Sequence, residues 1–200
     1  MSKDTRDRNN YFDKRSLETY FKEYSKRISE ALETVSIGNM EAAHLQLLRG
    51  DSGRVFVGGN GGSAAISDHL TCDFTKGIKK DGKHSFNVIS LCGSHALHTA
   101  IANDLGYEKT LSYQLELHSI CRLDTVILIS SSGNSPNIVS AAETAYAAGS
   151  CLISMTGFDG GKLNKVSDIQ LHVNADNYGI VEDCHQILMH TLAQYIYLND

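Results

Sequence analysis

From residue 54 onward, short apolar segments alternate with longer segments of helical pattern, and this alternation restricts the chain to few folds. The apolar segments are expected to be strands at residues 55–57, 86–91, 125–129, 151–155 and 169–173. Helices are expected between them near 63–76, 94–121 and 135–148, with a last helix over 180–198. Mostly apolar strands are typical of a parallel sheet covered on both faces. The pattern therefore predicts an α/β fold with a doubly wound, five-stranded parallel sheet that binds ligands at the carboxyl ends of its strands.

Residues 1–50 carry a helical pattern without strands. Between Leu17 and Val35, apolar side chains recur at steps of three and four residues, which places them on one face of a helix of about five turns. Gly38 and Asn39 are expected to end this helix, and a second helix is expected over 40–49. A small sheet does not need this additional apolar surface. We therefore divide the chain into an N-terminal helical segment for oligomerisation, 1–50, and a sheet domain, 51–200.

Composition excludes several classes of partner and compartment. With 18 Lys+Arg and 23 Asp+Glu the net charge is −5, which argues against nucleic acid or an anionic membrane as the main partner. No apolar run approaches the roughly 18 residues that span a bilayer, and the N-terminal MSKDTRDRNN is too polar for a secretory signal. The five cysteines include no C-x-x-C pair, so a zinc ribbon or a disulfide framework is not expected. We expect a cytoplasmic location.

Two predicted strands end in loops that suit a phosphate. Residues 58–63 read GGNGGS, a tight loop whose Ser63 could cap the next helix, and the motif alone fits a structural turn as well as an anion site. Residues 130–136 read SSSGNSP, in which Ser135 is expected at the N-cap and Pro136 at the first helical position. Four hydroxyls exceed what capping requires. Because a helix N-terminus also offers free N–H groups, the second loop is predicted to bind phosphate.

Two helices carry residues with metal-ligand spacing. His69 and Asp73 are four residues apart, and Glu182, Gln186 and His190 form a stripe at steps of four on the last helix. Two imidazoles and two carboxylates from two helices can close a tetrahedral zinc site. The same spacing also occurs on solvated helix faces, so spacing alone leaves both interpretations open.

Several of these motifs together resemble one family. The loops 59–63 and 130–135, the TGFDGG of residues 156–161 and the NDLGY of residues 103–107 resemble the sugar isomerase (SIS) domain, and more narrowly its phosphoheptose isomerase branch. The resemblance extends in the same order over roughly residues 10–198. It implies a flavodoxin-like sheet with N-terminal helices, a homotetramer with those helices in its core, and sites shared between subunits.

The resemblance also implies site residues. It places a sugar phosphate on the substrate-binding positions Asn60, Gly61, Ser63, Asp104, Ser130, Ser132 and Ser135. It implies a divalent metal, Zn²⁺, held by His69, Asp73, Glu182 and His190, although Asp73 stands where the family usually has Glu and Glu182 where it has Gln. Gly179 replaces an acidic residue often found there. The implied acid–base pair is Asp73 and His190, with Glu182 as a further candidate base, and whether these groups are ligands or proton carriers stays open.

The expected activity is an aldose–ketose isomerisation, in which a proton moves between C1 and C2 and a metal can polarise the carbonyl. The leading hypothesis is conversion of sedoheptulose 7-phosphate to D-glycero-D-manno-heptose 7-phosphate for lipopolysaccharide or capsule synthesis. One alternative is an isomerase of another ketose phosphate. A second is a non-catalytic tetrameric SIS protein of the type that associates with a replication initiator, which would not need the His and acid residues.

Overall fold

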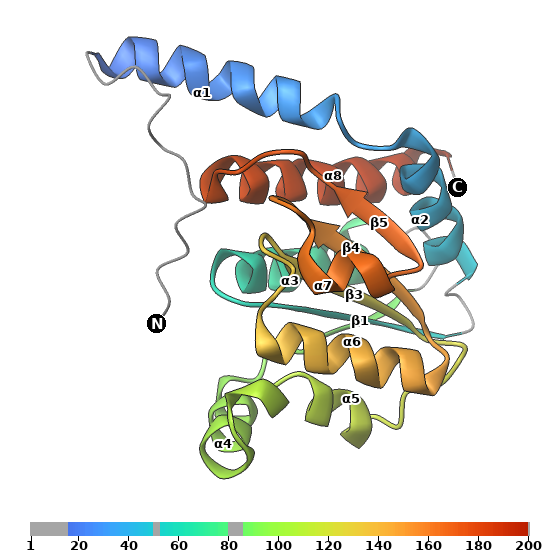
Figure 1. Cartoon of the computed structure of the whole chain (residues 1–200). Helices are drawn as coiled ribbons and strands as arrows, with labels where there is room; N and C mark the ends of the chain where they lie inside the picture. The colour runs from blue at the N-terminus through green and yellow to red at the C-terminus, as the bar shows by residue number, and fades with distance from the viewer. Residues whose placement is uncertain (1–15, 50–52, 80–85, 200) are drawn as a thin grey trace.

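The computed structural model describes residues 16–49, 53–79 and 86–199, which form three layers around a central sheet (Figure 1). All neighbouring strands are parallel, in the order β2-β1-β3-β4-β5. The strands are β1 (Arg54–Gly59), β2 (Asn87–Ser90), β3 (Thr125–Ser130), β4 (Cys151–Thr156) and β5 (Ile169–His172). The predicted flavodoxin-like α/β fold, with a doubly wound sheet of five parallel strands, is confirmed.

Two apolar cores lie on opposite faces of the sheet. Val55 and Val57 of β1 belong to one core and Phe56 to the other, because successive side chains of a strand point to opposite faces. The first core is covered by α1 (Leu17–Leu32), α2 (Ile37–Arg49), α3 (Gly62–Cys72) and α8 (Tyr178–Asn199). The second is covered by α5 (Ser112–Leu117), α6 (Pro136–Ala148) and α7 (Gly161–Val166), and α7 was not predicted.

The helical segment expected near 94–121 is present but divided. The chain forms α4 (His95–Leu105), a 3₁₀ turn (Tyr107–Lys109) and α5. Gly106 separates the first two with φ of +98°, a conformation outside the right-handed helical region that glycine adopts without a steric penalty. The break turns Tyr107 back toward the carboxyl end of β1, where its hydroxyl bonds to Asn60.

Two helix starts also differ from expectation. The second N-terminal helix begins at Ile37 and therefore includes Gly38 and Asn39; the Ser36 Oγ accepts the N–H of Asn39 at 3.3 Å, as an N-cap side chain does. α3 has Gly61 as its N-cap, so Ser63 lies buried in the first turn and does not cap the helix.

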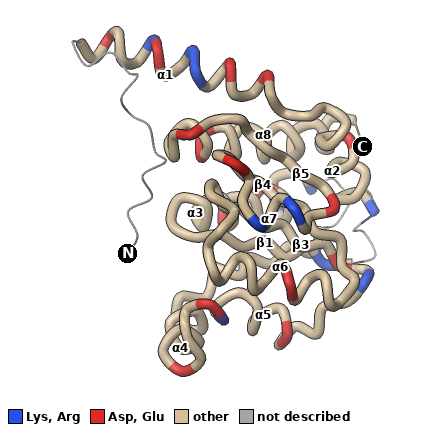
Figure 2. Tube along the Cα trace, in the orientation of Figure 1, with Lys and Arg blue, Asp and Glu red and all other residues tan. Residues whose placement is uncertain are grey.

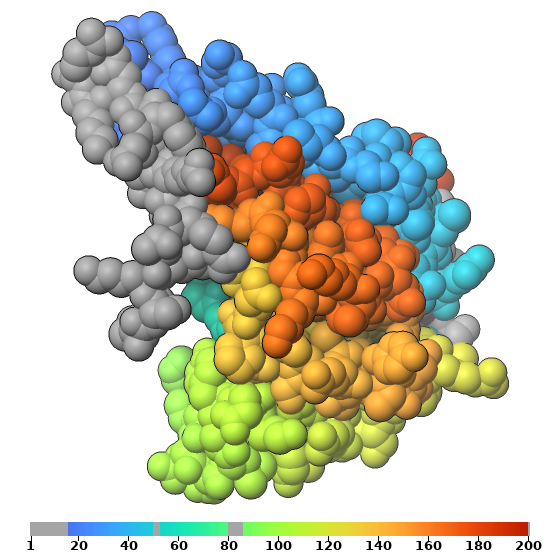
Figure 3. Space-filling model, in the orientation of Figure 1, coloured from blue at the N-terminus to red at the C-terminus, as the bar shows by residue number. Residues whose placement is uncertain are grey.

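α1 lies along one edge of the molecule, over α8 (Figures 1 and 3). Its Tyr24 donates a hydrogen bond of 2.7 Å to Asp183 of α8, while Leu17 and Phe21 are 84% and 67% exposed. Acidic and basic residues alternate along it (Figure 2) and form the pairs Glu18–Lys22, Glu23–Arg27 and Lys26–Glu30. Neither α1 nor another described helix has the length and apolarity needed to cross a membrane. The polar N-terminal residues 1–15 of the expected oligomerisation segment, and residue 50, lie outside the described ranges.

Candidate active site

A polar pocket opens at the carboxyl ends of β1 and β3. β1 is followed by β2 on one side of the sheet, and the chain then returns to β3 on the other side, so this is the topological switch point where doubly wound proteins bind ligands. The pocket has a volume of about 140 Å³. Its lining residues come from the glycine-rich loop and the first turn of α3, from the end of β3 and the serine loop that follows it, and from the start of α8: Asn60, Ser63, Ile129, Ser130, Ser131, Ser132, Ser135, Tyr178 and Glu182.

The serine loop is arranged to accept an anion. The Oγ atoms of Ser130 and Ser132 accept the N–H groups of Gly133 at 3.2 Å and Asn134 at 3.3 Å, which holds the loop in place. Ser135 is the N-cap of α6 with Pro136 at the first turn, as predicted, yet within the described chain its side chain makes no capping hydrogen bond. The Ser135 hydroxyl and the unpaired N–H groups of the first turn of α6 are therefore available to a ligand.

The loop after β4 supports the serine loop from behind. Gly133 has φ of +62°, and a Cβ there would lie 2.0 Å from the carbonyl oxygen of Gly160. Gly133 in turn accepts the N–H of Leu163 at 3.0 Å, and Ser131 accepts that of Gly157 at 2.9 Å. The TGFDGG segment thus fixes the shape of the serine loop by backbone contact.

Asn60 is fixed by its neighbours at the opposite wall. Asn60 and Asn137 each donate an amide hydrogen bond to the other, at 2.9 and 2.8 Å, and the Tyr107 hydroxyl donates a third to Asn60 at 2.8 Å. The 103–107 segment, which spans the end of α4 and the start of the 3₁₀ turn, therefore contributes Tyr107 to the site. Asp104 is exposed and bonds to the neighbouring Asn103, and neither it nor Gly61 is among the lining residues.

Glu182 reaches from α8 to the N-terminus of α3. A Cβ on Gly62 would lie 2.2 Å from its Oε2, so the carboxyl group lies directly against the backbone of the first helical turn. Burial, and next the nearby charge of Asp183, raise the pKa of Glu182. The structure therefore places Glu182 in the pocket.

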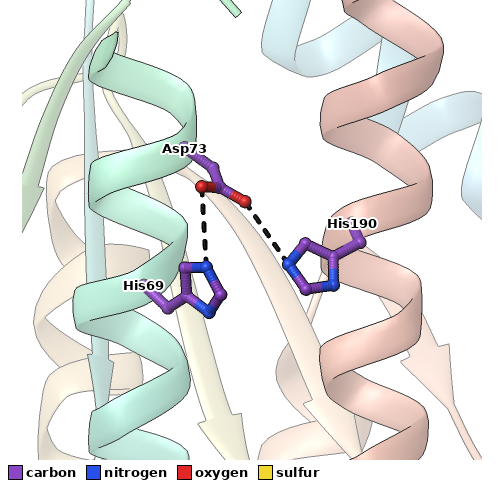
Figure 4. Close-up of side chains that lie close together, drawn as sticks. All are labelled: His69, Asp73 and His190. Atoms are coloured by element: carbon purple, nitrogen blue, oxygen red, sulfur yellow. Dashed lines mark ion pairs between the residues drawn. The ribbon is translucent and has the colours of Figure 1, made fainter. Parts of the chain in front are cut away.

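His69, Asp73 and His190 form a cluster between α3 and α8 (Figure 4). The Nε2 atoms of His69 and His190 lie 3.6 and 3.5 Å from the two carboxylate oxygens of Asp73, and one ligand atom from each residue lies within 4.8 Å of the others. Asp73 begins a π-helical turn (Asp73–Gly77), a deviation often found at functional sites. The chemistry and spacing of two imidazoles and one carboxylate fit a divalent metal.

Among the described residues, this cluster unites three of the four expected ligands. Glu182 is not in it; eight residues before His190, it stands about 12 Å away along the axis of α8. Gln186 lies beside the cluster instead, and its Nε2 is 3.1 Å from His69 Nδ1 and 3.3 Å from His190 Nε2. The sequence stripe contained Gln186, but without a role assigned to it.

Comparison with known proteins gives consistent matches. Residues 19–157 match the SIS domain family. A phosphoheptose isomerase of Helicobacter pylori (strain Shi470) is 32% identical over 177 residues, which are 88% of this chain and 91% of that protein. Structures of phosphoheptose isomerases from Neisseria gonorrhoeae and Francisella tularensis align with TM-scores of 0.81 and 0.82, both at 27% identity. Each alignment covers 90% of this chain, and 96% and 95% of the respective structures.

The sheet, the serine loop at its switch point and these matches agree, and the chain belongs to the SIS domain family. Relatives that share more than 30% of its residues include phosphoheptose isomerases, the branch that the sequence resemblance indicated. The protein is accordingly a phosphosugar isomerase.

Proposed function

We propose that the protein converts sedoheptulose 7-phosphate to D-glycero-D-manno-heptose 7-phosphate. The observation that carries this proposal is the placement of an anion pocket and a His/Asp/His cluster at two points along the same pair of helices, α3 and α8. A substrate that uses both must hold its phosphate and its carbonyl at opposite ends of a carbon chain. A ketose 7-phosphate has this form, and the names of the relatives support it.

In this proposal the Ser130, Ser132 and Ser135 hydroxyls and the first turn of α6 hold the phosphate. No lysine or arginine is among the described residues that line the pocket, so hydroxyls and backbone N–H groups carry the recognition. Asn60, fixed by Asn137 and Tyr107, and the buried Ser63 contact the sugar chain. Gly61 and Asp104 stay predictions as substrate contacts.

Isomerisation requires a group that takes the proton from C1 and returns it to C2 of the resulting enediol, while a second proton moves from O1 to O2. Asp73 and His190 lie side by side for these two transfers, and Glu182 is the third candidate, placed in the pocket. His69, Asp73 and His190 would hold a metal, which we propose to be Zn²⁺, and when bound it supplies a Lewis acid for the carbonyl.

Proton NMR of sedoheptulose 7-phosphate, with metal-stripped and with zinc-loaded protein, tests the activity. Growth of aldoheptose anomeric signals only with zinc is the expected result. If folded protein of both kinds leaves the ketose unchanged, the substrate assignment is wrong and other ketose phosphates are tested next. The residues that favour this alternative are Asp73, Glu182 and Gly179, which depart from the usual family pattern.

Asp73→Asn tests the role of the carboxylate. Loss of a proton-transfer group lowers turnover by about 10²–10⁴-fold, and the variant is expected to fold normally because Asp73 is only partly buried. Unchanged turnover would remove Asp73 from the mechanism. Solvent deuterium incorporation into the sugar is measured in Asp73→Asn and Glu182→Gln, and loss of exchange in a variant that still binds Zn²⁺ identifies the group that carries the C1 proton.

We also propose a homotetramer in which the N-terminal segment 1–50 packs between subunits, supported by the exposed Leu17 and Phe21 on α1. Light scattering of the intact chain and of Leu17→Ser/Phe21→Ser measures its mass; an unchanged tetramer in the variant would argue against α1 as the interface. A cytoplasmic location and a place in lipopolysaccharide or capsule synthesis complete the proposal. A non-catalytic binding role is disfavoured by the His/Asp/His cluster, which such a role does not need.

A further inference from the structure

The amide group of Gln186 lies between the two histidines of the cluster. Its Nε2 is 3.1 Å from Nδ1 of His69 on α3 and 3.3 Å from Nε2 of His190 on its own helix. The two imidazole rings meet edge to face, with centroids 4.9 Å apart. Gln186 therefore contacts both imidazoles, while Asp73 faces both through its two oxygens.

The position of Gln186 follows from helix geometry. Gln186 is one turn before His190 and thus on the same face of α8, about 6 Å along the axis. Glu182 is a further turn away, and its carboxyl group is directed to the backbone of Gly62. Of the two α8 side chains that precede His190 on this stripe, only Gln186 is within hydrogen-bond distance of the cluster.

The oxygen and the NH₂ group of a side-chain amide have nearly the same shape, but the oxygen accepts hydrogen bonds and the NH₂ group donates them. In the metal-free arrangement the Gln186 N–H groups face imidazole nitrogens, which can accept them when unprotonated. A metal ion on His190 Nε2 would occupy the lone pair there, and one held by His69 through Nε2, the nitrogen that faces Asp73, would leave Nδ1 of His69 protonated, so the same N–H groups would lose both acceptors. A half turn about the terminal bond brings Oε1, a lone-pair donor, to the position of Nε2.

We propose that Gln186 is the fourth protein ligand of the metal, through Oε1, together with His69, Asp73 and His190. This inference rests on the proposed metal-dependent function and replaces Glu182 in the ligand set expected from sequence. It has a consequence for charge, because the site then contains one carboxylate rather than two. A divalent ion in it keeps one net positive charge, and Glu182 is left free to contact the sugar.

Metal affinity tests this assignment without reference to turnover. Apo protein is titrated with Zn²⁺ against a chromophoric chelator, and with Co²⁺, whose visible absorption reports the ligands and their number. Gln186→Ala is expected to bind Zn²⁺ at least about tenfold more weakly and to alter the Co²⁺ spectrum. Gln186→Glu retains an oxygen ligand and is expected to restore affinity.

Gln194→Ala is the matched control, because it removes an exposed glutamine two turns further along α8. It is expected to leave metal affinity and spectrum unchanged, and circular dichroism confirms that each variant is folded. Glu182→Ala is also expected to keep the wild-type affinity. Wild-type affinity in Gln186→Ala, or weak binding in Glu182→Ala alone, would overturn the proposal.

The two proposals fail in different ways. Zinc binding that depends on Gln186, without conversion of the heptose phosphate, refutes the proposed substrate and leaves the ligand assignment intact. Zinc-dependent conversion with normal metal affinity in Gln186→Ala refutes only the ligand assignment. If the wild-type protein binds neither ion, the ligand assignment is refuted, and NMR with the metal-free protein decides the activity separately.

Discussion

Asn60 and Asn137 hold each other through two reciprocal amide hydrogen bonds, of 2.9 and 2.8 Å, between the first loop of the pocket and the first turn of α6. Asn137 is fully buried, and it also donates to Thr110 at 3.2 Å. The pair joins the loop after β1 to the helix after β3. The two halves of the proposed substrate site are therefore linked by side chains, beneath the surface that the substrate would touch.

Asn137→Ala removes this link. The Asn60 amide loses its partner and the Thr110 hydroxyl loses its donor, so the free energy of unfolding should fall by about 1–3 kcal/mol. Because Asn60 can then rotate, KM for the sugar phosphate should rise. Chemical denaturation and initial-rate kinetics measure the two effects. Tyr107→Phe, which removes one hydrogen bond to Asn60, should cause a smaller change of each; an equal or larger effect would show that Asn137 is not the main support.

Gly133→Ala should both destabilise the protein and weaken phosphate binding. The new Cβ would meet the carbonyl oxygen of Gly160 at 2.0 Å, and φ at this position is +62°. Backbone atoms on both sides prevent relief by a rotamer change, and the left-handed conformation adds about 1–2 kcal/mol. Thermal unfolding and the inhibition constant of inorganic phosphate test this. A variant with wild-type melting temperature and phosphate affinity would show that the two loops are not tightly coupled.

Gly62→Ala should change the kinetics of the enzyme more than its stability. Its Cβ would collide with the end of the Glu182 side chain, which can move aside, whereas the position itself is helical. Stability should therefore change by less than about 1 kcal/mol, while Glu182 is displaced from the pocket. The expected kinetics are those of Glu182→Ala. Gly62→Ala kinetics close to wild type, beside an impaired Glu182→Ala, would mean that the carboxyl group acts from a second position.

His185 should make the protein sensitive to mild acid. It is fully buried on α8, and burial lowers its pKa from the ordinary 6.5 to about 4. The unfolded chain binds this proton at higher pH than the folded one, so the contribution to stability is complete above pH 6.5 and is lost as the pH falls toward 4. The loss amounts to about 3 kcal/mol at most.

Urea denaturation of wild type and His185→Gln at several pH values measures this contribution. The variant should lose less of its own stability between pH 6.5 and 4 than the wild type does. His95→Gln, at an exposed position of α4, controls for the removal of an imidazole. Parallel curves for wild type and His185→Gln would show that other groups control acid unfolding.

The sheet could be predicted because each strand is apolar and short, and the loops could be predicted because glycines and hydroxyls gather at strand ends. The break at Gly106 could not, because one glycine within an apolar helical pattern is compatible with a continuous helix. Three of the four residues expected as metal ligands, His69, Asp73 and His190, lie together in the cluster. Glu182 and Gln186 share one stripe, and only the packing of α3 against α8 decides which of them lies beside His69.

One continuous helix, α8, carries both Glu182 at the pocket and His190 in the cluster. The distance between Glu182 and His190 is therefore fixed by the rise of the α-helix, and movement of a loop does not change it. In evolution, substitutions in the loops that line the pocket would alter which configurations of the sugar hydroxyl groups are accepted. A change in preferred chain length would instead require His190 and its partners to move together by a whole helical turn.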